Sequence, residues 1–491
     1  MAWVRPDGLG LPDRDYYLKT DERSVALRRE YRAHVERMLN LAGASADRAT
    51  VGADAVLAIE TSLAGALPDA AARRNPNSLT HLMTVAELQA LMPGFDWARY
   101  VTAARPPVFE RLNVASPEYI RQVNRIVVGT PLDDIKSYLR WHLVHGAAAV
   151  LPKAFVDADF AFFSHTLLGQ QQQQPLWRRC VTRTDEQLGE ALGQAFVAEV
   201  FGPQAKQDML RMVKDIEAAL ALDINGLAWM SETTRRAALE KLSAVEERIG
   251  YPDRWRDYSA LHTAPDEAFG NLVRVREWAN ARDWARIDRP TDRSEWPVTP
   301  ATVNSYYRAD RNSINFPAGI LQPPFYLAGR DEALNYGSAG GKYDTQGNVR
   351  NWWTAEDGKA FEARTSCVAN QYSDYVVAGD SRINGQLTLG ENTADNGGLR
   401  LALMAYLAGP GATAQPRVDG FTPEQRLFLG WAQGWCENAR PEAERVKAAI
   451  NPHSSNRYRV NGPSSNMPEF QKAFSCKADA PMVRQNACRV W

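Results

Sequence analysis

Glu391 and Asp395 are the residues whose type and spacing most clearly suggest chemistry in this sequence. They lie four residues apart within the stretch GENTADNG, residues 390–397. If that stretch is helical, both carboxylates project from one face, so one could bind a metal while the other orients a second ligand. The usual partner of such a pair is an HExxH helix, which supplies two histidine ligands and a general-base glutamate. HExxH occurs nowhere in the sequence.

Other metal ligands and other catalytic motifs offer weaker alternatives. Of the seven histidines, His142 and His145 stand three residues apart, but their apolar helical context favours packing over metal binding. The five cysteines form no CxxC pair and no zinc-finger spacing. The sequence also lacks GxSxG, a phosphate-binding loop and a dinucleotide-binding fingerprint.

Composition excludes several classes of partner. The chain has 491 residues, of which 45% are hydrophobic and 23% charged, the balance of an ordinary globular protein. Its 57 basic and 58 acidic residues give a net charge of −1, so we expect neither nucleic acid nor an anionic membrane as a partner. No apolar run reaches the roughly 18 residues of a membrane span, and the first residues lack a signal-peptide core.

Hydrophobic periodicity predicts a mainly α fold of the α+β class. The first 290 or so residues read as helical and carry three apolar stripes, and residues 287–300 read as a linker. Short strands are expected over 302–307 and 313–316, and helices around 356–376, 391–408 and 423–438. The stripes are Leu27, Tyr31, Val35 and Met38; Met209, Val213, Ile216 and Leu220; and Leu239, Leu242, Val245 and Ile249, the last helix entered at Ser231 and stopped at Gly250.

Seven motifs along the chain resemble, in order, those of the neprilysin and endothelin-converting enzyme family of zinc metallopeptidases. The resemblance covers both halves and is strongest from Val303 to Trp491. It is carried by GLGLPDRDYY (8–17), ERIGYP (247–252), VNSYY (303–307), NFPAGILQPPF (315–325), NYG (335–337), ENTAD (391–395) and CRVW (488–491).

The sequence departs from the family pattern in two places. After Gly340 the family continues into its HExxH helix, whereas here Gly340 is followed directly by Gly341 and the stretch KYDTQGN. About 15 residues, enough for the zinc-binding helix and its lead-in, are therefore absent. At the front, GLGLPDRDYY starts at Gly8, so we expect an N-terminal portion and any export signal to be missing.

The resemblance implies a thermolysin-like catalytic domain with a small β-sheet, facing a helical second domain. We place the helical domain at residues 1–288 and the metallopeptidase-like domain, lacking its zinc-binding helix, at 289–491. Family membership implies zinc as cofactor, short peptides as substrates and a periplasmic or extracellular location.

Individual roles follow residue by residue from the resemblance. Glu391 matches the third zinc ligand and Asp395 the carboxylate that buttresses a ligand histidine. His453 matches the oxyanion-stabilising histidine, and Arg459 the arginine that holds a substrate carbonyl; both are donors suited to developing or partial negative charge.

The remaining candidates form the substrate-binding surface. Asn304 and Ser305 match the edge strand that pairs with the substrate backbone, and Ile320, Phe325 and Trp435 match the pocket for the side chain after the scissile bond. For those three, plain core packing is the alternative. Cys367 and Cys488 match a disulfide, which would leave Cys180, Cys436 and Cys476 as free thiols.

Three hypotheses follow for function. One remaining carboxylate cannot hold zinc, which needs three protein ligands and a water, so the first is a metallopeptidase that is inactive as written and binds no zinc. The second is a noncatalytic peptide-binding relative, and the third is the product of a damaged gene.

Overall fold

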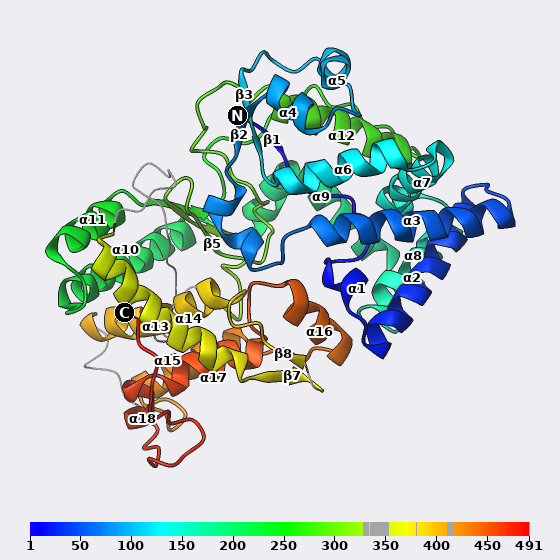
Figure 1. Ribbon diagram of the computed structural model, residues 1–491. Helices are drawn as coiled ribbons and strands as arrows, with labels where there is room; N and C mark the ends of the chain where they lie inside the picture. Colours follow the sequence, from blue (N-terminus) through cyan, green and yellow to red (C-terminus); the bar gives the residue numbers. More distant parts are fainter. Residues whose placement is uncertain (328–332, 334–352, 380, 410–416, 491) are drawn as a thin grey trace. The chain divides into compact units, whose positions relative to one another are not determined.

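The computed structural model describes residues 1–327, 333, 353–379, 381–409 and 417–490 (Figure 1). The junction between Gly340 and Gly341 lies outside the described residues. Contacts divide the chain into two compact units. Unit 1 comprises residues 1–176 and 257–292, and unit 2 comprises residues 177–256 and 293–491. This division differs from the linear boundary at residue 288, because residues 177–256 group with the C-terminal part of the chain.

Unit 1 is mostly helical. Its elements are β1 (Ala2–Val4), α1 (Asp15–Leu18), α2 (Glu22–Leu41), α3 (Ala46–Ala66), η1 (Ala72–Arg74), η2 (Pro76–Leu79), β2 (Leu82–Thr84), α4 (Val85–Leu91), α5 (Trp97–Ala104), β3 (Arg111–Val114), α6 (Pro117–Gly129), α7 (Leu132–Ala147), η3 (Ala148–Val150), α8 (Lys153–Asp159), the π-helix η4 (Phe160–Thr166) and α12 (Ala268–Trp284).

Unit 2 combines helices with short strands. Its elements are α9 (Leu176–Val200), α10 (Pro203–Gly226), α11 (Glu232–Ser243), β4 (Glu246–Gly250), β5 (Tyr306–Arg308), β6 (Ser313–Pro317), α13 (Ala355–Ser373), β7 (Val376–Ala378), β8 (Ser381–Arg382), α14 (Leu389–Ala408), α15 (Pro423–Gly434), α16 (Pro441–Ile450), α17 (Asn456–Ser465) and α18 (Pro468–Ala473). The predicted mainly α fold with small sheets is confirmed.

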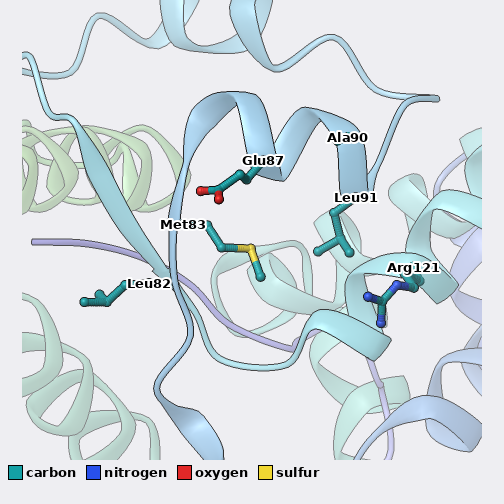
Figure 2. Close-up of a pocket in the computed structure, with 6 residues that line it drawn as sticks. All are labelled: Leu82, Met83, Glu87, Ala90, Leu91 and Arg121. Atoms are coloured by element: carbon teal, nitrogen blue, oxygen red, sulfur yellow. The ribbon is translucent and has the colours of Figure 1, made fainter.

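The small sheet of unit 1 borders a cavity. Its strand order is β1-β3-β2, with β1 parallel and β2 antiparallel to β3. Beside the edge strand β2 lies a cavity of about 540 Å³. Figure 2 shows its lining residues, which come from β2, α4 and α6 and include the charged Glu87 and Arg121. The Glu87 carboxylate already accepts hydrogen bonds from the Thr84 backbone and side chain, so it serves as a helix cap.

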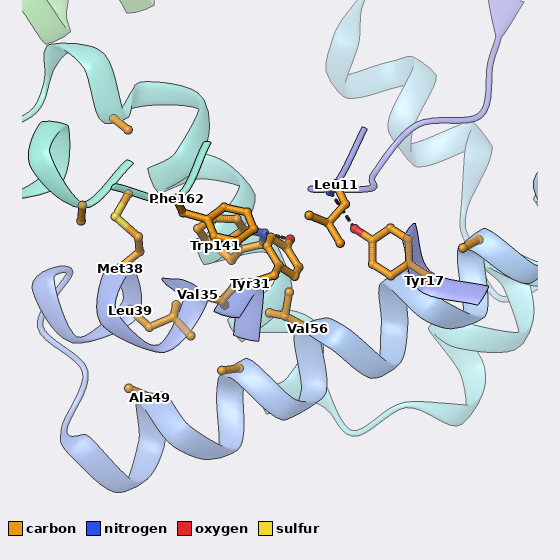
Figure 3. Packing of buried hydrophobic residues seen from close by; sticks show 14 residues of the cluster. Leu11, Tyr17, Tyr31, Val35, Met38, Leu39, Ala49, Val56, Trp141 and Phe162 are labelled. Carbon is orange, nitrogen blue, oxygen red and sulfur yellow. Dashed lines mark hydrogen bonds between the residues drawn. The ribbon is translucent and has the colours of Figure 1, made fainter. Parts of the chain in front are cut away.

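The core of unit 1 is built around a buried carboxylate. Glu60 on α3 is fully buried and accepts hydrogen bonds from the hydroxyls of Tyr17 and Tyr31, each at 2.7 Å. The indole nitrogen of Trp141 donates to its other oxygen at 3.3 Å. A buried carboxylate is tolerated only when donors surround it, and these donors come from α1, α2 and α7, so the carboxylate ties the three helices together. Figure 3 shows Tyr17, Tyr31 and Trp141 in the surrounding hydrophobic cluster.

The same core explains the glycine-rich motif near the start of the chain. A Cβ on Gly10 would lie 1.9 Å from the Tyr31 hydroxyl, so only glycine fits there. The backbone N–H of Leu11 donates to the Tyr17 hydroxyl at 2.8 Å, which joins the motif to the Glu60 cluster. The motif therefore has a structural role in unit 1.

The predicted helical stripes are confirmed in α2 and α10 and corrected after α11. Tyr31, Val35 and Met38 are buried on α2, as are Met209 and Val213 on α10. The expected continuation of a helix to residue 249 is wrong.

The helix that Ser231 caps ends at Ser243, and residues 246–250 form strand β4. This strand pairs in parallel with β6, with Ile249 opposite Phe316, so tertiary pairing overrides the helical pattern.

The sheet of unit 2 has the order β4-β6-β5, which leaves β5 at an edge. The expected strand over 302–307 starts later, at Tyr306, whose ladder partner is Asn315. A turn explains the delay, because the Thr302 N–H donates to the Thr299 carbonyl at 3.1 Å and the two hydroxyls lie 3.0 Å apart.

Among the described long helices of unit 2, α14 has the most buried residues. Arg400 on α14 pairs with the buried Asp223 on α10, and Leu401 and Ala405 pack against Ala219 beside that pair. Within the described parts of the chain, no helix combines the length and apolar character that crossing a membrane requires.

The Glu60 cluster makes a testable claim about stability. Glu60→Ala leaves the hydroxyls of Tyr17 and Tyr31 without their buried acceptor, so we expect the free energy of unfolding to fall by about 3–5 kcal/mol. The Trp141 indole N–H loses one of two acceptors and keeps the Tyr31 hydroxyl at 3.1 Å. Urea unfolding followed by circular dichroism measures this. Glu30→Ala, an exposed change on α2, is the control and is expected within about 0.5 kcal/mol of the wild type. Equal stability of both variants would contradict the role of Glu60.

Candidate active site

Helix α14 positions the carboxylates of Glu391 and Asp395. Glu391 lies in its first turn with its side chain 30% exposed, and Asp395 lies one turn later with its side chain 1% exposed. The predicted helix over 391–408 is therefore confirmed. One turn of helix therefore separates a carboxylate that solvent or a ligand can reach from one that is enclosed by protein.

Asp395 is bound by Arg459 in a two-pronged ion pair. Nε of Arg459 donates to one carboxylate oxygen at 2.7 Å, and an Nη donates to the other at 2.6 Å. Burial raises the pKa of the Asp395 carboxyl above its ordinary value, while the charge and hydrogen bonds of Arg459 oppose that shift. The partner that the structure gives Asp395 is thus an arginine on α17, where the resemblance predicted a histidine.

Two aromatic side chains complete the surroundings of Arg459. Its guanidinium carbon lies 3.7 Å from the ring centre of Trp435, a cation–π contact, and its backbone carbonyl accepts from the indole N–H of Trp431 at 2.9 Å. Phe325 meets Trp435 edge to face with ring centres 6.4 Å apart. The structure therefore brings together Asp395, Arg459, Trp435 and Phe325, which the sequence analysis had named separately.

His453 lies against the exposed carboxylate of the pair. Its Nε2 is 3.2 Å from Oε2 of Glu391, and its Nδ1 lies 2.9 Å from Oδ1 of Asn451. The backbone N–H of His453 also donates to that same Asn451 oxygen at 2.9 Å, which fixes the amide as an acceptor. The loop before α17 thus holds the imidazole in place beside Glu391.

Two asparagines of the GENTADNG stretch carry a buried network that sequence reasoning missed. Asn392 accepts from the Ser454 hydroxyl at 2.6 Å and so ties α14 to the loop bearing His453. Asn396 accepts at 2.7 Å from Asn466, whose amide also donates to Gln371 at 2.9 Å. Polar residues at 392, 395 and 396 in a mostly apolar helix were the available signal, because such residues are buried only with partners.

Other predicted site residues lie elsewhere in unit 2. Ile320 packs in a cluster with Val197 and Phe201, whereas Trp435 belongs to the cluster around Phe428 and Trp431. Of the three residues predicted to form this pocket, Phe325 and Trp435 contact each other, and Ile320 packs in a different cluster.

Asn304 and Ser305 are exposed and immediately precede the edge strand β5. They lie outside the strand itself. Their main-chain groups could pair with a peptide only if β5 were extended towards the N-terminus to include them.

The residues described do not fit the donor set that zinc requires. A catalytic zinc site needs three protein ligands and an open position. Apart from the residues left undescribed, no group of three histidine, cysteine, aspartate or glutamate side chains is placed to hold a metal ion. Glu391 has His453 beside it, while Asp395 is committed to Arg459, so this half-site offers one accessible carboxylate and one imidazole.

The predicted disulfide is present. Cys367 on α13 bonds Cys488 near the C-terminus with Cα atoms 5.6 Å apart. It closes a loop across 121 positions, worth about 4–5 kcal/mol in the loop-entropy account. Cys180, Cys436 and Cys476 are free, as expected.

Comparisons with known proteins place this chain in a class of peptidases. Two models described as peptidase family M13 match residues 1–252 and 304–490. The chain therefore belongs to peptidase family M13, and the resemblance to neprilysin and endothelin-converting enzymes is confirmed.

Individual relatives cover nearly the whole chain. Endothelin-converting enzyme 1 of Rattus norvegicus is 35% identical over 520 residues, which span 99% of this chain and 68% of the relative. The zinc metalloprotease Zmp1 of Mycobacterium tuberculosis, solved with an inhibitor, is 36% identical with a TM-score of 0.92 and covers 99% of this chain and 77% of that one. PepO of Lactobacillus rhamnosis is 25% identical with a TM-score of 0.89, over 98% of this chain and 78% of that one.

The buried pair at the site predicts a clear thermodynamic cycle. Asp395→Ala leaves the Arg459 guanidinium buried without its anion, so we expect a loss of about 3–5 kcal/mol in the free energy of unfolding. Replacing both partners, as Asp395→Leu with Arg459→Met, should recover much of that loss, because no unpaired charge remains. Urea unfolding of Asp395→Leu, Arg459→Met and the double variant closes the cycle and measures the coupling.

Arg457→Ala provides the matched control. Arg457 is an exposed arginine on the same helix, and its guanidinium stacks on the ring of Tyr458. A loss below about 0.5 kcal/mol is expected for it. Additive losses in the Asp395 and Arg459 variants would show that the pair is not coupled.

Proposed function

We propose that this M13 family member binds short peptides in unit 2 and does not hydrolyse them as its sequence stands. One observation carries the proposal: the residues that match the family's substrate-binding groups are present, whereas the HExxH motif that supplies two zinc ligands is absent. Arg459, Trp435, Phe325 and His453 are present and supported by neighbours, whereas the sequence contains no HExxH.

The lengths of the compared sequences support an internal loss. The alignment with the rat enzyme spans 520 positions although this chain has 491 residues. The relative must therefore carry residues that have no counterpart here. Such residues fit the expected absence of a zinc-binding helix after Gly340.

Arg459 is suited to hold a peptide carbonyl. Asp395 occupies its Nε and one Nη, and Trp435 covers one face of the guanidinium. The donors of the other Nη stay directed away from that carboxylate and can serve an incoming carbonyl oxygen. Because two partners fix the guanidinium beforehand, little side-chain entropy is lost when a peptide binds.

His453 supplies a second donor position in this cluster. In a peptidase with a complete site, an imidazole so placed stabilises negative charge on a reacting carbonyl. In this chain its Nε2 faces Glu391, so the group contributes polarity and orientation to a binding site. No hydrolytic step follows from these residues alone.

The compartment expected from the family is periplasmic or extracellular. The disulfide between Cys367 and Cys488 supports that expectation, because disulfides persist in oxidising compartments. A hydrolytically competent peptidase and the product of a damaged gene are the competing possibilities, and each gives a different experimental result.

Metal content and turnover test the absence of hydrolysis. We expect purified protein to hold zinc well below one equivalent by elemental analysis after dialysis, and to leave a quenched fluorescent peptide uncleaved. Rat endothelin-converting enzyme 1, assayed in parallel, shows that the peptide and buffer permit cleavage. Stoichiometric zinc together with chelator-sensitive cleavage would overturn the proposal.

Peptide affinity tests the binding function. We expect a library of short labelled random-sequence peptides to give saturable binding by fluorescence anisotropy, and Trp435→Ala to weaken it about tenfold or more through loss of an aromatic contact. Arg457→Ala should leave the affinity unchanged. A chain that unfolds without cooperativity would indicate a damaged gene, and a cooperatively folded chain that binds no peptide would contradict a peptide-binding role.

A further inference from the structure

Three histidines of unit 1 gather around one buried tryptophan, and the proposed function uses none of them. Trp141 on α7 is fully buried. The ring of His34, on α2, meets it edge to face at 5.4 Å, and the ring of His145 stacks on it at 5.0 Å. His142, the neighbour of Trp141, lies 6.2 Å from it between ring centres.

Two of these histidines lie beside carboxylates. Nδ1 of His145 is 3.2 Å from Asp159 on α8. Nε2 of His142 is 3.0 Å from Glu60, within ion-pair distance although the ring is not oriented for a hydrogen bond. Both imidazoles therefore have an acidic side chain within ion-pair distance.

His34 differs because its surroundings are aromatic. It is 5% exposed and stacks on Phe162 with ring centres 5.2 Å apart and planes 14° apart. Phe163 meets it edge to face at 5.4 Å. Its Nε2 is buried and has no hydrogen-bond partner within the described chain.

The charged groups around His34 do not compensate for its burial. Burial is the main effect and lowers the pKa of His34 from 6.5 to about 4. Asp159 and a hydrogen bond with the backbone of Ala158 oppose this shift, while the charges of His145 and Arg37 add to it.

Cation–π attraction from the surrounding rings is too small to reverse this balance. Such contacts contribute about 0.5–2 kcal/mol, whereas burying an ion without a partner costs several kcal/mol. A proton on His34 therefore favours conformations in which the ring has left its aromatic surroundings.

The rings that enclose His34 lie on an unusual segment. Phe162 and Phe163 belong to the π-helix Phe160–Thr166, which continues α8. Its wide turn is visible in the hydrogen bond from the Leu167 N–H to the Phe162 carbonyl at 2.9 Å, five residues back. π-helical turns are rare, and they frequently mark functional sites.

We propose that His34 is an acid-sensitive latch, whose protonation releases the segment from Lys153 to Thr166 from α2 and loosens unit 1. At neutral pH the neutral ring packs against Phe162 and Phe163 and holds the segment down. In acid the charged ring moves to water and each of the two phenylalanines loses one of its ring contacts.

The direction of the pH effect follows from the two protonation states. The histidine has a pKa of 6.5 when exposed in the unfolded chain and about 4 in the folded one. The stability that His34 contributes is complete above pH 6.5 and is lost as the pH falls from 6.5 towards 4. Between pH 7.5 and 4.5 this single group raises the unfolding or opening constant by roughly 50- to 100-fold.

Hydrogen–deuterium exchange on the full chain tests the latch. At pH 7.5 we expect strong protection of residues 153–166, and at pH 4.5 protection factors lower by roughly 50- to 100-fold after correction for intrinsic exchange rates. His34→Phe keeps the stacked ring without a titrating group and should retain protection at pH 4.5. His34→Leu is a second non-titrating variant in case the larger ring does not fit.

An exposed histidine of the same unit provides the control. His262→Phe should show the same acid-induced loss of protection as the wild type. The proposal is overturned if residues 153–166 stay protected at pH 4.5 in the wild type. It is also overturned if a folded His34→Phe or His34→Leu variant loses protection to the same extent as the wild type.

Discussion

The ion pair between Asp395 and Arg459 is the interaction on which the organisation of the site depends. Asp395 is almost completely buried on α14, so its charge is tolerated only because two hydrogen bonds from α17 meet it. The pair fixes the distance and rotation between the two helices. Everything that the site presents to a ligand follows from this placement, including the guanidinium over Trp435 and the loop that carries His453.

A polar network extends that constraint through the rest of unit 2. Asn392 and Ser454 join α14 to the loop before α17, and Asn396 and Asn466 join it to the helix bearing Gln371. Fully satisfied buried networks of this kind specify one arrangement of helices, because any shift leaves a donor or acceptor without a partner. The half-site can therefore keep its geometry without the HExxH segment that the sequence lacks.

Sequence reasoning predicted elements well where one local pattern dominates. The stripe on α2 and the capping serine at 231 needed only apolar spacing and a side-chain oxygen, so the helix of α2 and the start of α11 agree with the prediction, although α11 ends at Ser243. Ile249 was misplaced because its strand exists only through pairing with β6, more than sixty positions away in the chain.

The site shows the same limit. Resemblance supplied Asp395 and Arg459 as separate candidates, but nothing in their sequence positions, 64 residues apart, indicates that they bind each other. The absence of HExxH can be read directly from the sequence. Burial of Asn392, Asn396 and His34 required the packed structure, because their partners are distant in sequence.

The bond between Cys367 and Cys488 makes the site part of a covalent ring. Helices α14, α15 and α17, and with them Glu391, Asp395, Trp435, His453 and Arg459, all lie between the two cysteines. A protease that cuts a surface loop within this ring opens the backbone but releases no fragment. The two ends stay tethered, so a nicked molecule keeps the whole cluster on one covalent framework until a reductant reaches the bond.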